Sequence, residues 1–291
     1  MAGFDRGLLG RRFGRAADRY AAVAALQREV ESRLLEGLER MTIEPVVVLD
    51  VGSGPGRATG VLRKRFRSAQ VIALDIAIPM LRQARRQGSW WHPVSAVCAD
   101  AGALPLADGS VDLLFSSLCL QWLDDVPATL AEFRRVLRPG GLMLVTTFGP
   151  DTLGELRDAW VAGDARAHVS AFAPMAAVGD ALMAQGFRDP VLDRDVFTLS
   201  YAALDDLIGE LRAIGANNAR RDRSRALTGK SAWRRMRSAY DAMRDVDGRY
   251  PATYEVIYVQ AVAPDPGQPR RGAAGEIATI PVSSIRRRPS R

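Results

Sequence analysis

Apolar side chains recur at intervals of three or four residues through the first forty positions of the chain. Phe13, Ala16, Tyr20 and Val23 begin a series that continues at the same spacing to Leu38, with arginines and acids between its members. This spacing is typical of amphipathic helices that cover a core. The pattern predicts N-terminal helices over residues 5–41.

Farther along the chain, short apolar runs alternate with amphipathic segments of about ten to fifteen residues. The first run, VVVLD at 46–50, is β-branched and uninterrupted, as strands are when both faces of a parallel sheet are covered. Such alternation predicts a doubly wound parallel sheet in an α/β fold. The expected strands of this core, which spans 45–150, are 46–50, 69–76, 96–101, 110–118 and 141–148.

The pattern changes after residue 148. Two helical regions, 151–187 and 203–248, alternate there with two long β-forming runs, 190–201 and 253–263. Together with the core they predict a seven-stranded, mostly parallel sheet with helices on both faces and a helical insertion that covers one edge. We expect one domain over 1–263 and a basic tail rich in proline and glycine at 264–291.

The composition excludes several classes of protein. The chain has 291 residues, 47% of them apolar, which is enough for a large core. No apolar run approaches the roughly 18 residues of a membrane-spanning helix. The Arg-rich N-terminus contains Asp5 and Asp18 and lacks the apolar region of a secretory signal, which favours a folded helix over a targeting segment. We therefore expect a cytoplasmic protein outside the membrane. The protein is also expected to be a monomer.

Metal chemistry is not expected. The chain has two cysteines, Cys98 and Cys119, and two histidines, His92 and His168, without CxxC or HxxxH spacing. The cysteines are typical of buried reduced thiols that act as small hydrophobic side chains.

The net charge is +7, and nearly all cations are arginines. They concentrate at 220–237 and in the tail. Nucleic-acid binding is not expected, because no aromatic platform or recognition motif accompanies the basic residues. A solvated face and a docking surface for an acidic macromolecule remain the alternatives.

A glycine-rich loop, LDVGSGPG at 49–56, follows the first predicted strand. A dinucleotide-binding loop would need a third glycine at 57, where arginine stands, and Pro55 removes an amide from a phosphate-binding turn. Glycines at 52 and 54 would still let a ligand pass close to the backbone. The loop therefore indicates a nucleoside ligand other than a dinucleotide or a P-loop triphosphate.

Acids end the first three predicted strands, at Asp50, Asp75 and Asp100. Ligands of open α/β sheets bind at this carboxyl edge. Asp50 would repel a pyrophosphate but attract the ammonium or sulfonium group of S-adenosylmethionine. Asp75 is placed to accept the ribose hydroxyls, and Asp100 with Ala101 is placed to contact the adenine.

In this order and spacing, the motifs resemble those of the class I S-adenosylmethionine-dependent methyltransferases. The resemblance covers about residues 46–150 and rests on LDVGSGPG, ALDIAIPML, CADAGALPL, SVDLLFSSLCLQWLDD and LRPGGLMLVTTF. It implies a Rossmann-like fold and S-adenosyl-L-methionine as the cofactor. The cofactor-binding residues that it implies are Asp50, Gly52, Gly54, Gly56, Asp75, Ile76, Asp100, Ala101 and Leu118.

The flanking segments narrow the resemblance. FGRAADRYAAVAALQREV, TFGPDTLGELRDAW with HVSAFAP, and TYEVIYVQAVAPDPGQPRRG are similar to segments of the malonyl-[acyl-carrier protein] O-methyltransferases of biotin biosynthesis. With them the similarity extends over almost the whole chain. The methyltransferase-like assembly factors of respiratory complex I share the DTLxELR segment and are an alternative. A small-molecule carboxyl methyltransferase is another.

This resemblance implies methyl transfer to the free carboxylate of a malonyl group on an acyl carrier protein. That carboxylate is ionised at neutral pH, so no general base is needed. Tyr20 matches the family's tyrosine at the methyl-transfer site; the alternative is that its ring only packs in the core. His168 is a candidate substrate contact; the alternative is a surface or helix-capping role. The substrate carboxylate also needs a cation. We expect it in the basic insertion, with Arg234, Arg235 and Arg237 as candidates for binding the substrate or its carrier.

Overall fold

The computed structural model describes residues 3–164, 166–216, 218–221, 223, 228–265, 270–272 and 275–277. The chain begins with two consecutive helices, α1 (Arg6–Val23) and α2 (Ala25–Glu39), which meet at Ala24. The Asp5 side chain caps α1 by accepting a hydrogen bond from the backbone N–H of Leu8 at 2.9 Å. The region 5–41 is thus helical in two segments.

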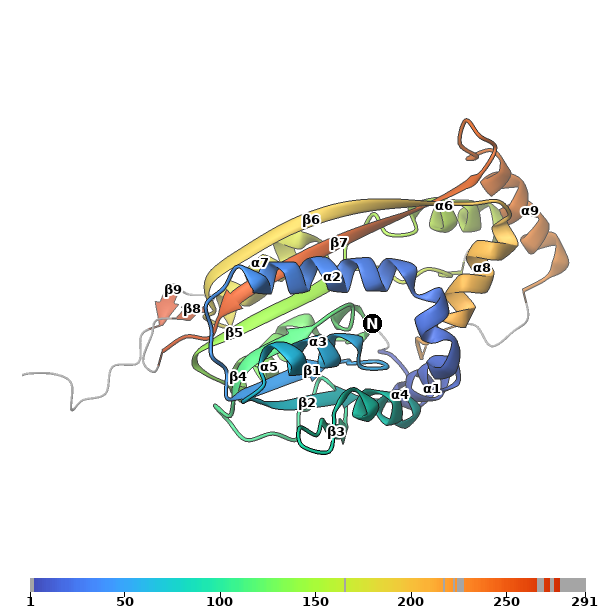
Figure 1. The fold of residues 1–291 in the computed structure, drawn as a ribbon. Helices are drawn as coiled ribbons and strands as arrows, with labels where there is room; N and C mark the ends of the chain where they lie inside the picture. The colour runs from blue at the N-terminus through green and yellow to red at the C-terminus, as the bar shows by residue number, and fades with distance from the viewer. Residues whose placement is uncertain are drawn as a thin grey trace, which may run out of the picture.

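Seven strands form one sheet in the order β3-β2-β1-β4-β5-β7-β6 (Figure 1). They are β1 (Val47–Val51), β2 (Gln70–Asp75), β3 (Ser95–Cys98), β4 (Val111–Ser116), β5 (Leu137–Phe148), β6 (Arg188–Tyr201) and β7 (Tyr250–Val262). β7 is antiparallel to β5 and β6, and the other neighbouring strands are parallel. The predicted α/β fold with a seven-stranded, mostly parallel sheet is confirmed.

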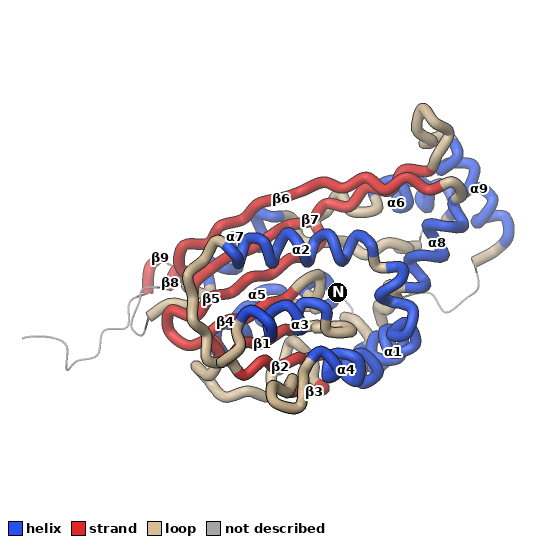
Figure 2. The backbone as a smooth tube through the Cα atoms, in the orientation of Figure 1, coloured by secondary structure: helices blue, strands red, loops and turns tan. Residues whose placement is uncertain are grey.

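Helices cover both faces of this sheet (Figures 1 and 2). On one face, α2 and α3 (Arg57–Arg65) pack on β1, β2, β4 and β5 through an apolar cluster that includes Leu38, Leu62 and Phe115. On the other face, α5 (Val126–Val136) and α7 (Met175–Ala184) pack through a second cluster that includes Phe133 and Leu182. Burying both faces explains why the central strands read as continuous apolar runs.

A third group of helices lies at one end of the sheet, at the right of Figure 1. The insertion between β6 and β7 forms α8 (Leu204–Ala213) and α9 (Lys230–Asp241), and α6 (Gly154–Gly163) packs beside α9. Leu156, Leu207, Met236 and Tyr254 join these elements to β7 in one apolar cluster. α1 lies at the same end, between α8 and α4 (Ile78–Ala84).

The structure differs from the sequence prediction at α7 and adds a short strand pair in the predicted tail. α7 was expected among the substrate-side helices of 151–187, but it packs against α5 and β6. Its buried residues Val178 and Leu182 belong to the apolar cluster on the face of the sheet that α5 covers. In the basic tail 264–291, the structure describes the short antiparallel pair β8 (Arg270–Gly272) and β9 (Gly275–Ile277). Most of the predicted tail lies outside the described residues.

Candidate active site

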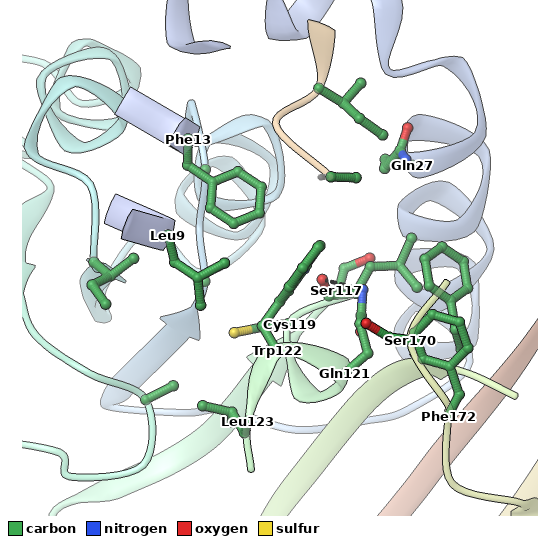
Figure 3. Close-up of a pocket in the computed structure, with 18 of the residues that line it drawn as sticks. Leu9, Phe13, Gln27, Ser117, Cys119, Gln121, Trp122, Leu123, Ser170 and Phe172 are labelled. Atoms are coloured by element: carbon green, nitrogen blue, oxygen red, sulfur yellow. Dashed lines mark hydrogen bonds between the residues drawn. The ribbon is translucent and has the colours of Figure 1, made fainter. Parts of the chain in front are cut away.

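A cavity lies where the carboxyl ends of β1, β2 and β4 meet (Figure 3). Residues that follow these strands directly, Gly52, Ile76 and Ser117, form its floor. Other parts of its wall come from α1, from Gln27 of α2, from the segments 99–101, 118–123 and 168–172, from α6 and from residues at the end of α8. This is the position at which open α/β sheets bind ligands.

The glycine loop brings bare backbone to the cavity. Gly52 and Gly54 line it and have left-handed backbone, with φ of 70° and 53°. A Cβ at Gly52 would lie 2.6 Å from Cβ and Sγ of Cys119, which follows β4. A Cβ at Gly56, at the start of α3, would lie 2.5 Å from the Cα of Ala84. The loop therefore needs glycine at 52 for its close approach to Cys119 and at 56 for packing of α3 on α4.

Asp75 is the acid that faces the cavity from β2. Its carboxylate accepts hydrogen bonds from the backbone N–H groups of Gly54 at 2.9 Å and Ala77 at 2.8 Å. Burial nevertheless raises its pKa to about 6. A carboxylate held by backbone donors and directed at a cavity is suited to accept hydroxyl groups of a ligand.

Asp50 does not line the cavity but lies directly behind the glycine loop. It is 2% exposed, and its carboxylate accepts a hydrogen bond from the hydroxyl of Thr59 at 2.5 Å. Burial, opposed by that hydrogen bond and reinforced by the nearby carboxylates of Glu31 and Asp75, raises its pKa to about 7. A bound cation would favour the ionised form of these acids, so the site is electrostatically suited to a positively charged ligand.

Asp100 lines the cavity but is already engaged by protein donors. One carboxylate oxygen accepts from the backbone N–H of Gly102 at 2.9 Å, and the other pairs with Nε of Arg6 at 2.9 Å. Each carboxylate oxygen has a second lone pair, so a hydrogen bond from a ligand remains open to it. The neighbouring Ala101 and Leu118 add apolar surface to the cavity.

Tyr20 lines the cavity from α1, together with Leu9 and Phe13, which lie on the same helix face. Burial raises the pKa of its phenol, with the acids Glu31 and Asp75 adding to the shift, so the hydroxyl stays protonated at neutral pH. Figure 3 shows Leu9 and Phe13 on the side of Trp122, and the rings of Phe13 and Trp122 meet edge to face at 5.4 Å. This contact holds α1 over the cavity.

His168 lines the cavity from the segment that precedes α7. Its ring stacks on Trp160 at 3.5 Å between centroids, and its Nε2 lies 2.8 Å from a carboxylate oxygen of Asp164. These contacts fix the ring. His168 is therefore both a packed residue and part of the cavity wall.

The three arginines expected to bind the substrate do not line the cavity. Arg235 donates to the carbonyls of Ala162 and Gly163 at the end of α6, and Arg237 pairs with Asp205 of α8 at 2.9 Å. Arg234 lies on the exposed side of α9. α9 packs on α6 through its apolar face, which includes Met236. The role of these three arginines toward the substrate or its carrier stays a prediction.

The sequence pattern did not single out several residues of the cavity wall. Arg6 is one: it donates to the carbonyl of Trp122 at 2.6 Å and pairs with Asp100 and Asp124. Others are Gln121, Phe148, Leu153, Phe172 and Tyr254. Leu9 and Phe13 could have been found, since their spacing from Tyr20 places them on its helix face. The others come from separate elements and meet only in the fold.

Within the described part of the chain, no three acidic, histidine or cysteine side chains gather as a metal-binding group. Over the same residues, no helix combines the length and apolarity that crossing a bilayer requires.

Comparison with known proteins agrees with this geometry. Residues 49–145 match the family described as "Methyltransferase domain". The malonyl-[acyl-carrier protein] O-methyltransferase of Xylella fastidiosa is 50% identical over 97% of this chain and 96% of its own length, and that of Gallionella capsiferriformans is 45% identical over 93% and 95%. The YcgJ protein of Bacillus subtilis has the same fold, with a TM-score of 0.59 at 16% identity over 82% of this chain and 99% of its own. With such identity over nearly its whole length, the chain belongs to the malonyl-[acyl-carrier protein] O-methyltransferase family.

Proposed function

We propose that the protein transfers a methyl group from S-adenosyl-L-methionine to the free carboxylate of malonyl-[acyl-carrier protein]. The products are the malonyl methyl ester and S-adenosylhomocysteine, an early step of biotin synthesis. The observation that carries the proposal is the identity of 50% and 45%, over almost the full length, to two enzymes named for this reaction. The cavity lined by the glycine loop, by Asp75 and Asp100 and by α1 supports the proposal.

The residues present fit the cofactor. Asp75 would accept the ribose hydroxyls, and the bare backbone at Gly52 and Gly54 would let the methionine part pass. The buried carboxylates of Asp50 and Asp75 favour a positively charged group beside them. When bound, the cofactor supplies an electrophilic methyl group on a sulfonium.

The protein's own task in this reaction is alignment and exclusion of water. A malonyl carboxylate is already the nucleophile at neutral pH, so no side chain has to remove a proton. Leu9, Phe13, Leu118 and Phe172 make much of the cavity wall apolar, which weakens solvation of the attacking carboxylate. Tyr20, protonated at neutral pH, can donate a hydrogen bond into the cavity.

The test is incubation with methyl-labelled S-adenosylmethionine and malonyl-carrier protein, followed by mass spectrometry of the carrier. We expect a mass increase of one methyl group on the malonyl arm. Cofactor binding without transfer to any malonyl thioester would favour a non-catalytic assembly role instead. Transfer to free malonate at a comparable rate would favour a small-molecule carboxyl methyltransferase. The cytoplasmic location and the monomeric state stay predictions from the sequence.

A further inference from the structure

The outer face of α1 carries a row of arginines, Arg11, Arg15 and Arg19, spaced four residues apart. All three are exposed. None forms an ion pair or a side-chain hydrogen bond with another residue of the described chain. The spacing places them on one side of the helix, in a row about 12 Å long. We call these three residues the α1 arginine row.

The α1 arginine row lies on the back of the helix that covers the cavity. The opposite side of α1 presents Leu9, Phe13 and Tyr20 to the cavity. A third side packs against α4 through glycines: a Cβ at Gly10 would lie 3.2 Å from the Ile76 carbonyl oxygen, and one at Gly14 would lie 3.3 Å from Pro79. One helix, about 10 Å thick, therefore separates the arginines from the methyl-transfer site.

Two acids near the row are held by other groups. Asp18, on the same helix, accepts a hydrogen bond from Gln83 of α4 at 3.2 Å. Asp5 is the N-cap of α1; the backbone N–H of Leu8 lowers its pKa, and Arg11 together with two further arginines adds to the effect. One carboxylate at the start of the helix thus faces several guanidinium groups.

Further cations lie beside the start of α1. The backbone N–H of Arg221 donates to the carbonyl of Gly3 at 2.9 Å, which fixes the segment 218–221 against the N-terminus. Partial burial lowers the pKa of Arg12, and the nearby charge of Arg223 lowers it further. Such crowding of like charges costs free energy that an anionic partner would recover.

We propose that the α1 arginine row is the docking surface for the acidic helical surface of the acyl carrier protein. This inference rests on the proposed function and names the place where the carrier binds. An acidic helix laid along the row would form ion pairs while the prosthetic arm enters beside α1. The arginines of α9 are less suited to this task, since Arg235 and Arg237 are engaged within the protein. Exposed, complementary charges of this kind mainly raise the rate of association.

The test compares two charge-reversal variants of the full chain. The first is R11E/R15E/R19E. The matched control is R40E/K64E/R67E, which reverses three exposed cations at the ends of α2 and α3, on the amino side of the sheet. Each variant is assayed with malonyl-carrier protein and with malonyl-pantetheine, which has no protein surface. Circular dichroism checks that both variants fold. If the triple variant does not fold, the double variant R15E/R19E, which keeps Arg11 beside the N-cap Asp5, is assayed in its place.

We expect the α1 variant to raise KM for malonyl-carrier protein about tenfold or more, with kcat and the reaction of malonyl-pantetheine unchanged. Raising the salt from 0.15 to about 0.5 M should reproduce the effect in the wild-type protein, because ionic screening shortens the range of surface charges. An unchanged KM, an equal loss with both substrates, or an equal loss in the control variant would overturn the inference. If the wild-type protein methylates neither malonyl substrate, the proposed function itself fails.

Discussion

The two sides of the cavity are built differently. The glycine-loop side, which we propose binds the cofactor, is called the cofactor side; there the backbone N–H groups of Gly54 and Ala77 hold Asp75, and Thr59 holds Asp50. On the covering side, α1 is held by side-chain contacts such as that between Phe13 and Trp122, which come from distant parts of the sequence. The first side is fixed by local backbone geometry, whereas the second depends on packing between elements. The cofactor side is thus suited to a common ligand, and the covering side to selecting a particular acceptor.

The largest effect is expected on the cofactor side, from Gly52→Ala. The new methyl group would lie 2.6 Å from Cys119, in a left-handed backbone that disfavours alanine. Steric conflict and strain together should lower the free energy of unfolding by about 2–4 kcal/mol and weaken cofactor binding. Urea unfolding and calorimetry with S-adenosylmethionine measure both.

Gly54→Ala is the matched control for that substitution. Its backbone is also left-handed, but a Cβ there would have no atom within 4 Å. The expected loss is only about 1–2 kcal/mol, from the backbone conformation alone. Equal losses at the two positions would contradict the steric explanation for Gly52.

The next effect belongs to the covering side. Tyr20→Phe removes a hydroxyl from the cavity wall and keeps the aromatic ring of this α1 residue. If the hydroxyl orients the acceptor mainly in the transition state, kcat should fall tenfold or more, about 1.4 kcal/mol, with little change in thermal stability. Steady-state kinetics and a thermal melt give both readouts. Unchanged kcat would assign Tyr20 to packing alone, and the covering side would then act only as a lid.

The contrast between the two sides also explains what the sequence can predict. The sheet, the glycine loop and Asp75 follow from local patterns: an apolar run, a turn and an acid at a strand end. Such patterns retain their meaning in any tertiary context. The sequence motif also placed Asp50 near the ligand, but its position behind the loop depends on its hydrogen bond to Thr59, one turn into the next helix.

The covering side was harder to predict, because its geometry depends on how helices pack. The charge run at 220–237 indicated a basic surface, but no local pattern tells that Arg235 binds carbonyls of α6 or that Arg237 pairs with Asp205. Likewise, the role of Arg6 depends on Asp100 and Asp124, more than ninety residues away. The four-residue spacing of the arginines on α1 is visible in the sequence. That this helix covers the cavity could be seen only in the fold.

A smaller effect is expected from pH, which should change the charge of the acids on the cofactor side but not that of Tyr20 on the covering side. Burial raises the pKa of Asp75 to about 6, above its value in the unfolded chain, so the folded protein without cofactor binds the extra proton. The stability that this group contributes is present below about pH 4 and is lost as the pH rises through about 6. A cationic cofactor needs the ionised form, so its affinity should rise over the same range.

Calorimetry at pH 5.5 and 7.5 tests this expectation. From Asp75 alone, S-adenosylmethionine should bind about fourfold more weakly at pH 5.5. Asp75→Asn should remove the part of the dependence that comes from Asp75, while the part that comes from Asp50, whose pKa is raised to about 7, should persist. Tyr20 on the covering side does not titrate in this window, since burial raises its pKa further above the ordinary value. A flat profile in the wild-type protein would show that the acids do not sense the cofactor.

The smallest effects are expected at the arginines of α9, which belong to the packing of the covering side. Arg237→Ala breaks an exposed ion pair with Asp205 and should cost well under 1 kcal/mol of stability. Arg235→Ala removes hydrogen bonds to the last carbonyls of α6 and should cost about 1 kcal/mol. Neither should change KM for malonyl-carrier protein by more than about twofold, because neither guanidinium is available to a partner. A large KM effect at Arg237 would show that its pair with Asp205 opens to bind the carrier, and docking would then extend from α1 across α8 to α9.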